Sequence, residues 1–409
     1  MISWRELWSV FGRIGLLSFG GPAAQIALMH RELVERRPWL TEEQFLRGLA
    51  FCTLLPGPEA MQLAAHAGWR LRGTAGGLLA GLLFVLPGAA IVMALAALYL
   101  AYGALPQVEA AFLGVQAAVL AIVAQALAKL SCRAVRGPAQ IAAALLAFLA
   151  LFALGLPFWA VLGTAGLVGL LLPAGGPAAP APPAPAVSTV RTILLWLAIW
   201  WLPLFPFIAL MPGSPPAQAA VFFSWLATIS FGGAYAVLAA LTQTAVEGYG
   251  WLGTEEMIDG LGLAETTPGP LILVTVFVAW LGGASAGWPT ALLTALIALW
   301  ATFAPCFLWI FAGSPHLERL TAQPRLQGAL RLIQAAVVGV MGSLALWFSL
   351  HVLFARFEEG AALPDLASLD GAALVLALLA GLLLGPAGRG VPLTLLACAL
   401  AGLGMSAAL

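Results

Sequence analysis

The stretch Ser18-Phe19-Gly20-Gly21 occurs a second time as Ser230-Phe231-Gly232-Gly233, and Pro56-Gly57-Pro58 occurs a second time as Pro268-Gly269-Pro270. Both pairs are separated by 212 positions. Between Phe11 and Pro58 this single offset matches 17 of 48 residues without a gap. Matches at one fixed offset indicate an internal duplication. The chain therefore consists of two homologous repeats.

The duplication continues beyond these motifs, where the offset between the copies becomes 218. It pairs Pro87 with Pro305, and the run 116–119 with the run 334–337. Between the copies, from Pro173 onward, lies a tract rich in Ala, Pro and Gly that is typical of an extended linker. The sequence predicts an N-terminal repeat over residues 1–172, a Pro/Ala-rich linker over 173–190 and a C-terminal repeat over 191–409.

The composition is that of a polytopic membrane protein. Hydrophobic residues make up 62% of the chain, charged residues 8%, and the mean hydropathy is +1.01. A soluble domain carries about a quarter of its residues as charges, so soluble enzymes and disordered scaffolds are excluded. The net charge is zero and the longest basic run is Arg36-Arg37, which excludes a nucleic-acid partner.

Apolar runs predict an all-α fold. Runs of about 20 residues, the length that crosses the hydrocarbon as a helix, occupy residues 75–102, 108–130, 192–211, 287–312 and 332–355. Residues 139–172 and 371–408 each hold two shorter spans. We expect about nine crossings.

We expect no metal or cofactor site. The four cysteines show neither metal-binding spacing nor a disulfide framework. These cysteines are Cys52, Cys132, Cys306 and Cys398.

The charges predict that the repeats are inverted relative to each other across the membrane. Residues 30–47 carry four arginines, whereas their counterparts 242–259 carry only the acidic residues Glu247, Glu255, Glu256 and Asp259. Lys129, Arg133 and Arg136 likewise correspond to an uncharged segment, 347–354. Cytoplasmic loops retain positive charge. Inverted repeats are the architecture of many secondary transporters.

Each repeat also contains two interruptions of its apolar sequence. Residues 41–55 and 59–72 are each too short to span, and both ends of this pair are basic, so we expect a re-entrant helical hairpin that turns at Pro56-Gly57-Pro58. Its twin runs from Thr254 to Leu281. Pro58 and Pro270 are natural helix starts, and the first-turn N–H groups of a helix attract anions. Corresponding breaks in both halves point to a midplane binding site.

We therefore expect four helix starts to converge on one anion. The Ser-Phe-Gly-Gly breaks offer the same chemistry as the Pro-Gly-Pro turns, since glycines allow the backbone to form a concavity lined by N–H groups. The competing interpretation is that these glycines and prolines only kink helices for packing. The predicted substrate-binding residues are Ser18, Phe19, Gly20, Gly21, Pro56, Gly57, Pro58, Gln62, Ser230, Phe231, Gly232, Gly233, Thr267, Pro268, Gly269 and Pro270.

Three ionisable residues at membrane depth are candidates for proton coupling or charge pairing, because such residues are costly there. Glu59 and Glu265 each lie beside a Pro-Gly-Pro turn. Alternatively, Glu59 complements a helix dipole and Glu265 lines a solvated cavity. Arg13 either pairs with the substrate or Glu59, or extends to the membrane interface. His30, His66 and Gln25 are weaker candidates that we expect to bond neighbouring helices.

One segment matches a catalytic motif. Residues 283–287 read Gly-Ala-Ser-Ala-Gly and fit the pattern of a serine nucleophile at Ser285, which would make the chain an intramembrane serine hydrolase. That motif requires a strand, a turn and a helix, whereas this run links two predicted helices. We expect no enzymatic activity.

The motifs together resemble those of the chromate ion transporter family. The resemblance rests on Ser18–Pro22, Leu33–Arg36 with Trp39-Leu40, Leu55–Pro58 with Gln62, and Leu86-Pro87, followed by their second-half copies. Long members of that family consist of two fused homologous halves. The second copy departs from the first at Ala234, Thr267, Leu271 and Val274, which replace Pro22, Leu55, Glu59 and Gln62. The two half-sites are therefore chemically unequal.

The resemblance implies export of chromate, a tetrahedral dianion similar to sulfate, across the cytoplasmic (inner) membrane, and chromate resistance. Combined with the inverted repeats, it predicts a multi-pass secondary active transporter that works by alternating access, with protons as a possible coupling ion. A passive anion channel built from the same hairpins is the alternative. The lipid bilayer is the expected surrounding, and a homodimer is among the assemblies that the sequence allows.

Overall fold

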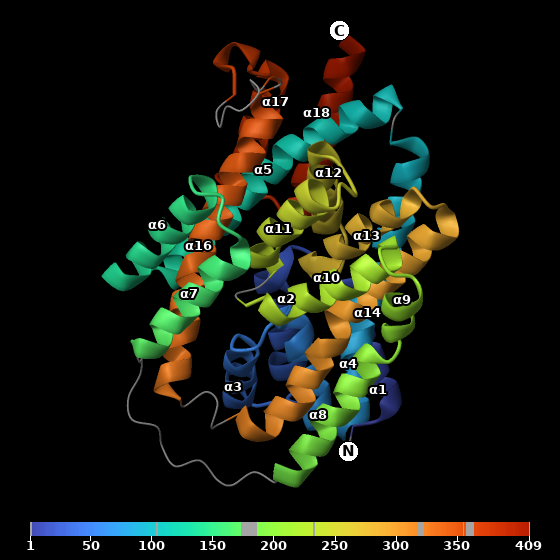
Figure 1. Cartoon of the computed structure of the whole chain (residues 1–409), viewed down its shortest axis with the longest axis vertical. Helices are drawn as coiled ribbons and strands as arrows, with labels where there is room; N and C mark the ends of the chain where they lie inside the picture. Colours follow the sequence, from blue (N-terminus) through green and yellow to red (C-terminus); the bar gives the residue numbers. More distant parts are fainter. Residues whose placement is uncertain are drawn as a thin grey trace.

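The computed structural model describes residues 2–103, 105–172, 186–231, 234–317, 323–354, 356 and 364–408. These residues are helical almost throughout, and an isolated β-bridge joins Phe354 and Leu369. Figure 1 shows the two chain ends at opposite ends of the longest axis. The predicted all-α fold is confirmed.

The first half contains α1 (Trp4–Leu16), α2 (Gly21–His30), the π-helix η1 (Arg31–Glu35), α3 (Glu42–Cys52), α4 (Glu59–Tyr102), α5 (Pro106–Ala134), α6 (Pro138–Phe152) and α7 (Phe158–Leu171). The second half contains α8 (Ala186–Trp201), α9 (Phe205–Leu210), α10 (Pro215–Ile229), α11 (Ala234–Thr242), the π-helix η2 (Gln243–Gly248), α12 (Thr254–Thr266), the 3-10 helix η3 (Leu271–Leu273), α13 (Val274–Ala284), α14 (Trp288–Gly313), η4 (Ser314–His316), α16 (Pro324–Leu353), η5 (Leu366–Ser368), α17 (Gly371–Leu384) and α18 (Val391–Ala408).

Four helices of the described chain are long and apolar enough to cross a membrane: α4, α5, α14 extended through η4, and α16. The predicted short spans appear as the pairs α6–α7 and α17–α18. The run 192–211, which we expected to be one span, is instead divided into α8 and α9. Pro203 explains the division, because proline disfavours helical backbone at the residue before it.

The predicted linker is only partly described. Residues 173–185 lie outside the described residues, and α8 already begins at Ala186. The last residues that we assigned to the linker, 186–190, therefore belong to the first helix of the second half. The prolines of the tract end at Pro185, so nothing in the sequence after it prevents helix formation.

Each half contains three helical segments in succession that reverse direction twice, first at the Pro-Gly-Pro turn and again after the second segment. Although α4 is continuous by hydrogen bonding, its backbone leaves the helical region at Arg72 and Gly73 and reverses direction there. A Cβ added at Gly68 would lie 2.3 Å from the Gly76 carbonyl oxygen, so residues 59–71 and 74–102 lie backbone to backbone. In the second half, α13 and α14 reverse in the same way through residues 285–287.

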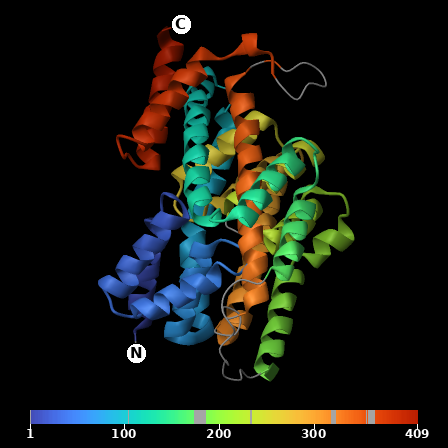
Figure 2. The same cartoon turned by 90° about the vertical axis from the view of Figure 1, so that its left-hand side faces the viewer.

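The long helix of each half packs against the last helix pair of the other half. α5 contacts α17 and α18, and α16 contacts α6 and α7, as Figure 2 also shows. A Cβ added at Gly114 of α5 would lie 2.0 Å from the Cys398 oxygen, and one added at Gly339 of α16 would lie 2.0 Å from the Ala144 oxygen. Small residues allow this approach, as in other membrane helix bundles. The halves therefore interlock.

Local signals in the sequence explain where the hairpin helices begin. Thr41 and Gln44 form a capping box at the start of α3. At the equivalent place in α12, the Glu256 carboxylate accepts a hydrogen bond from the Gly253 N–H at 2.7 Å. Both hairpins therefore begin with the same backbone arrangement at the same position of the repeat.

Candidate functional site: the crossed turns at the centre

The four breaks meet in the middle of the molecule through two reciprocal hydrogen bonds. The Gly57 N–H donates to the Ser230 carbonyl oxygen at 3.0 Å, and the Gly269 N–H donates to the Ser18 carbonyl oxygen at 3.0 Å. Each Pro-Gly-Pro turn thus binds the Ser-Phe-Gly-Gly break of the other half. Two equivalent contacts exchanged between copies are what a two-fold relation between those copies produces.

A second pair of contacts is exchanged between the halves, and each of these contacts lies against one Pro-Gly-Pro turn. A Cβ added at Gly88 of α4 would lie 2.0 Å from the Pro268 oxygen, and one added at Gly57 would lie 2.9 Å from the Cys306 Sγ of α14. Gly88 and Cys306 are equivalent at the offset of 218. Gly57 and Gly269 have φ angles of 122° and 99°. Only glycine adopts such backbone readily, and here it also provides the space for the opposite half.

Two buried amides complete the crossing. The Gln62 Nε2 donates to the Pro56 carbonyl oxygen at 2.7 Å and closes the first turn. The Gln25 Nε2 donates to the carbonyl oxygens of Gly269 at 2.7 Å and Ser18 at 3.2 Å. Both Oε1 atoms are buried without a hydrogen-bond partner among the described residues. Unpartnered buried polar atoms are costly, so these two acceptors mark places where a proton-bearing group would be bound favourably.

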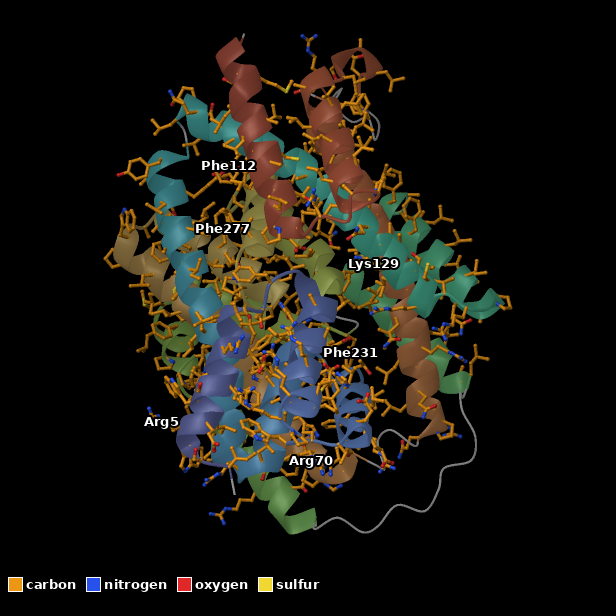
Figure 3. All side chains as sticks on the ribbon, turned by 180° about the vertical axis from the view of Figure 1, so that it is seen from behind. Arg5, Arg70, Phe112, Lys129, Phe231 and Phe277 are labelled. Carbon is orange, nitrogen blue, oxygen red and sulfur yellow. The ribbon has the colours of Figure 1, made fainter. Side chains whose placement is uncertain are left out.

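The hydroxyl groups at the breaks terminate the preceding helices. Ser18, Ser230 and Thr267 donate to the carbonyl oxygens of Ile14, Ala227 and Ala264, respectively. They therefore act as helix caps rather than as open donors. Phe19 is exposed and Phe231 partly so, and Figure 3 shows Phe231 midway between Arg70 at one end and Phe112 at the other.

The glycines and prolines of the breaks shape the helix starts. Gly20 and Gly21 have φ angles of 85° and 77° and introduce α2. Pro58 and Pro270 are the N-caps of α4 and η3 rather than their first residues, so each helix begins one position later than we predicted. Gly232 and Gly233 lie outside the described residues. The turns' own glycine N–H groups are occupied, so the donors left for an anion are first-turn N–H groups such as those of residues 59–61.

The three charged candidates lie in different surroundings. Glu59 is partly buried at the start of α4, without a hydrogen bond or ion pair to any described residue, and Arg133 acts on it electrostatically. Glu265 is buried near the second turn. Arg13 is exposed, makes no ion pair with Glu59, and contributes positive charge near Glu32.

The weaker candidates bond neighbouring residues, as we expected. His66 contacts the Ser314 Oγ through Nδ1 at 3.0 Å, and His30 contacts Glu35 and Glu42 at 3.1 and 2.7 Å. Hydrogen bonding to Glu42 raises the pKa of His30. No group of three or more His, Cys, Asp or Glu residues suited to a metal ion occurs in the described parts of the chain.

A buried carboxylate escaped the sequence analysis. We counted Asp259 only among the acidic residues of segment 242–259, but it lies on the buried face of α12 and is only 5% exposed. Its oxygens accept hydrogen bonds from the Tyr99 hydroxyl at 2.7 Å and the Gln116 Nε2 at 2.8 Å. The available signal was its position between the apolar pairs 257–258 and 260–261.

Two cavities lie away from the crossed turns. One, of about 380 Å³, is lined by Arg47, Arg70, Leu317 and polar residues of α3. The other, of about 440 Å³, lies between α6, α11, η2 and α16 and includes Thr242 and Glu247. Neither of these two cavities is lined by a described residue of the breaks.

The serine hydrolase motif has no catalytic setting. Ser285 is exposed at the end of α13, in a turn between two helices. The strand, turn and helix that a nucleophile elbow requires are not formed there.

Comparison with known proteins identifies the family. The profile described as chromate transporter matches residues 5–170 and again residues 217–403. The chain belongs to the chromate transporter family. The matched segments cover most of both halves and omit residues 171–216, which include the linker, α8 and α9.

Named relatives agree with this assignment. The chain is 33% identical over 355 residues to the chromate transport protein of Pseudomonas aeruginosa, covering 84% of this chain and 80% of that one. It is 30% identical over 342 residues to the probable chromate transport protein of Synechococcus elongatus, covering 83% of each. No solved structure matches. This chromate transporter family member is a multi-pass membrane protein and not an enzyme.

Proposed function

We propose that this protein exports chromate, or a similar tetrahedral oxyanion such as sulfate, across the cytoplasmic membrane as a secondary active transporter. Family membership supports the substrate. The observation that carries the mechanism is the exchange of hydrogen bonds between Gly57 and Ser230 and between Gly269 and Ser18. Such a crossing couples the two halves at one central point, which alternating access requires.

Three observations support repeats of inverted topology. The family profile matches the two halves separately. The turn and break contacts are exchanged between equivalent positions, and the long helix of each half packs on the last helix pair of the other. The arginine-rich segment 30–47 corresponds to the acidic segment 242–259. In the proposed arrangement the first lies on the cytoplasmic side and the second outside.

The helix pairs α3–α4 and α12–α13 fit the proposed re-entrant hairpins. α3, of 11 residues, is too short to cross the hydrocarbon, and so is the 59–71 segment of α4. His66 lies against Gly48, so the two helices run side by side from their turn. The oxyanion would be bound by first-turn N–H groups where such helices begin, beside Gln62 and the two breaks.

Glu59 is the proposed proton carrier. It is the carboxylate at the helix start of the first turn and forms no ion pair with a described residue. A carboxylate beside a bound dianion is repelled by it, so substrate binding and protonation of Glu59 favour each other. The second copy has Leu271 at this position. One proton site would therefore serve one substrate site, with Glu265 as a secondary candidate.

The experiment is isotope uptake of chromate and of sulfate into proteoliposomes, with and without an imposed pH gradient. Wild type is compared with Glu59→Gln and with the control Glu109→Gln, which alters an exposed carboxylate of α5. We expect saturable flux that responds to the gradient in wild type and in Glu109→Gln, and loses the response in Glu59→Gln.

Other results would change the proposal in defined ways. Flux that scales with the gradient without saturating would indicate a passive anion channel. Saturable flux that ignores the pH gradient in all variants would indicate a carrier driven by voltage alone. Sulfate flux without chromate flux would reassign the substrate, and no flux of either would refute it.

A further inference from the structure

The two hairpins are equivalent in sequence position but differ in what covers them. On α12, Ile258, Asp259 and Gly262 form a buried face, with Ile258 1% exposed. The equivalent residues of α3 at the offset of 212 are Leu46, Arg47 and Ala50, and all three are exposed, Leu46 by 51%. The opposite faces of both helices are buried alike.

The face of α12 is covered by α5 and the end of α4. Asp259 accepts the hydrogen bonds from Tyr99 and Gln116 described above. A Cβ added at Gly262 would lie 2.2 Å from the Val115 Cγ1, so the helices touch closely. The Tyr99 ring also packs edge-on against Phe112 and Phe277, with centroids 5.2 and 5.3 Å away. Figure 3 shows these two phenylalanines toward the end opposite Arg70.

Among the described residues, the equivalent side chains do not close over α3 in the same way. At the offset of 218, the counterparts of Tyr99, Val115 and Gln116 are Leu317, Ile333 and Gln334. Leu317 lines the cavity of about 380 Å³ together with Arg47 and Arg70. Ile333 of α16 lies against Gly166 of α7 instead of α3. α3 packs mainly on α4, whereas α12 also packs on α5 and α16.

Contact with lipid does not explain the exposed face of α3. Arg47 lies on this face and forms an ion pair of 2.5 Å with Glu43, one turn earlier. Charged side chains are costly against lipid, which favours contact of the face carrying Arg47 with water. Equivalent positions of the two homologous repeats thus differ: one borders a cavity lined by polar and charged side chains, and the other forms a closed, hydrogen-bonded contact.

We infer that Asp259, Tyr99 and Gln116 form the closed gate at one end of the transport path, and that the cavity at Arg47 and Arg70 is the open entrance at the other. This inference rests on the proposed alternating access. Since the repeats are homologous, exchanging their conformations generates the second state. In it α3 docks on α16, Ala50 meets Ile333 and Arg47 meets Gln334, while α12 leaves α5.

Two cysteine pairs, introduced after replacement of the four native cysteines, test the exchange. In Val115→Cys/Gly262→Cys the two Cβ atoms lie 3.7 Å apart, inside the range for a disulfide. The equivalent pair is Ala50→Cys/Ile333→Cys. A protease site inserted between residues 173 and 185 separates the halves, so a disulfide is detected as two fragments that remain joined on a non-reducing gel.

We expect the first pair to crosslink in resting membranes and to stop transport until a reductant is added. The second pair should crosslink several-fold faster with substrate and a gradient than at rest. Tyr99→Phe removes one hydrogen bond of the gate and should raise the crosslinking of the second pair further. Tyr102→Phe, at an exposed ring near the same helix end, is the control and should leave it unchanged.

The outcomes separate this inference from the proposed function. If the second pair never crosslinks and the locked first pair still transports, the gate is refuted. If wild type transports neither chromate nor sulfate, the proposed function fails, but the crosslinking yields still decide the gate. In that case Tyr99→Phe must shift the yield from the first pair to the second, and an unchanged ratio overturns the inference.

Discussion

The side-chain amide of Gln25 bridges the two halves, because its Nε2 lies 2.7 Å from the carbonyl oxygen of Gly269 and 3.2 Å from that of Ser18. Gln25 belongs to the first half and Gly269 to the second. The Gly269 N–H in turn donates to Ser18. The three residues form a closed set of hydrogen bonds, and this set holds the second turn against the first break.

Gln25→Leu should therefore weaken the crossing. The substitution keeps a buried side chain of similar size but leaves two buried carbonyl oxygens with fewer donors, which costs about 1–3 kcal/mol. We expect a lower thermal unfolding temperature in detergent and slower transport. Gln107→Leu, at an exposed glutamine of α5, is the control. Equal unfolding temperatures for the two variants would show that the bridge contributes nothing.

The turn glycines are tested by Gly57→Ala and Gly269→Ala. Both positions have positive φ angles, and a Cβ at Gly57 would lie 2.7 Å from the Gln62 Nε2. Backbone strain alone costs about 1–3 kcal/mol, and displacement of the opposite half adds to it. We expect transport to fall by about tenfold or more. Gly155→Ala shares a positive φ but meets nothing within 4 Å. Gly155→Ala should transport normally. An equal loss of transport in Gly155→Ala would show that backbone strain alone causes the effect.

These contacts mark the boundary of what the sequence predicts. The breaks, the hairpins and most spans are visible because repeated motifs and apolar length are properties of single segments. Repetition shows that Gly57 and Gly269 are equivalent, but it does not show that each one bonds the break of the other half. That pairing depends on how the halves dock. The N–H groups that we expected to face an anion are for the same reason partly occupied by carbonyl oxygens.

Asp259 illustrates a second limit. Its copy in the first half is Arg47, which lies at an exposed position, and acidic residues near the start of a helix are ordinarily explained by the helix dipole. Only the packing of α12 on α5 shows that this carboxylate is buried and bound by Tyr99 and Gln116. The division between α8 and α9 at Pro203 is a smaller error of the same kind, since hydropathy alone does not detect a break.

Close packing of α1 on α4 is tested by Gly15→Leu. A Cβ at Gly15 would lie 2.0 Å from the Leu83 carbonyl oxygen, so a side chain there forces the helices apart. Overpacking of this kind costs about 1–3 kcal/mol or more. Gly12→Leu, one turn earlier in the same helix, meets nothing within 4 Å. We expect thermal unfolding in detergent to fall clearly only for Gly15→Leu, and equal values would exclude a tight contact.

The proposed inversion of the repeats is tested by single cysteines at Arg36 and Tyr249 in a background without native cysteines. Arg36 lies in the arginine-rich segment and Tyr249 in the acidic segment, and both side chains are exposed. An impermeant maleimide should label one position in right-side-out vesicles and the other in inside-out vesicles. Labelling of both positions from the same face would refute the inverted arrangement.

The corner between α2 and α3 should make stability depend on pH. Hydrogen bonds to Glu42 and Glu35 raise the pKa of His30 above its ordinary value of 6.5. A folded-state pKa above the unfolded value contributes stability below about pH 6.5, and this stability is lost as the pH rises through the raised pKa. Both carboxylates are well exposed, so solvent screening limits the contribution to at most about 1 kcal/mol.

The unfolding temperature of His30→Gln should thus lie below that of wild type near pH 6 and approach it near pH 9. Glu42→Gln should reduce the same difference. A gap between wild type and His30→Gln that is constant across this range would show that His30 acts by packing against Phe45, whose ring lies 5.1 Å away, and not by charge.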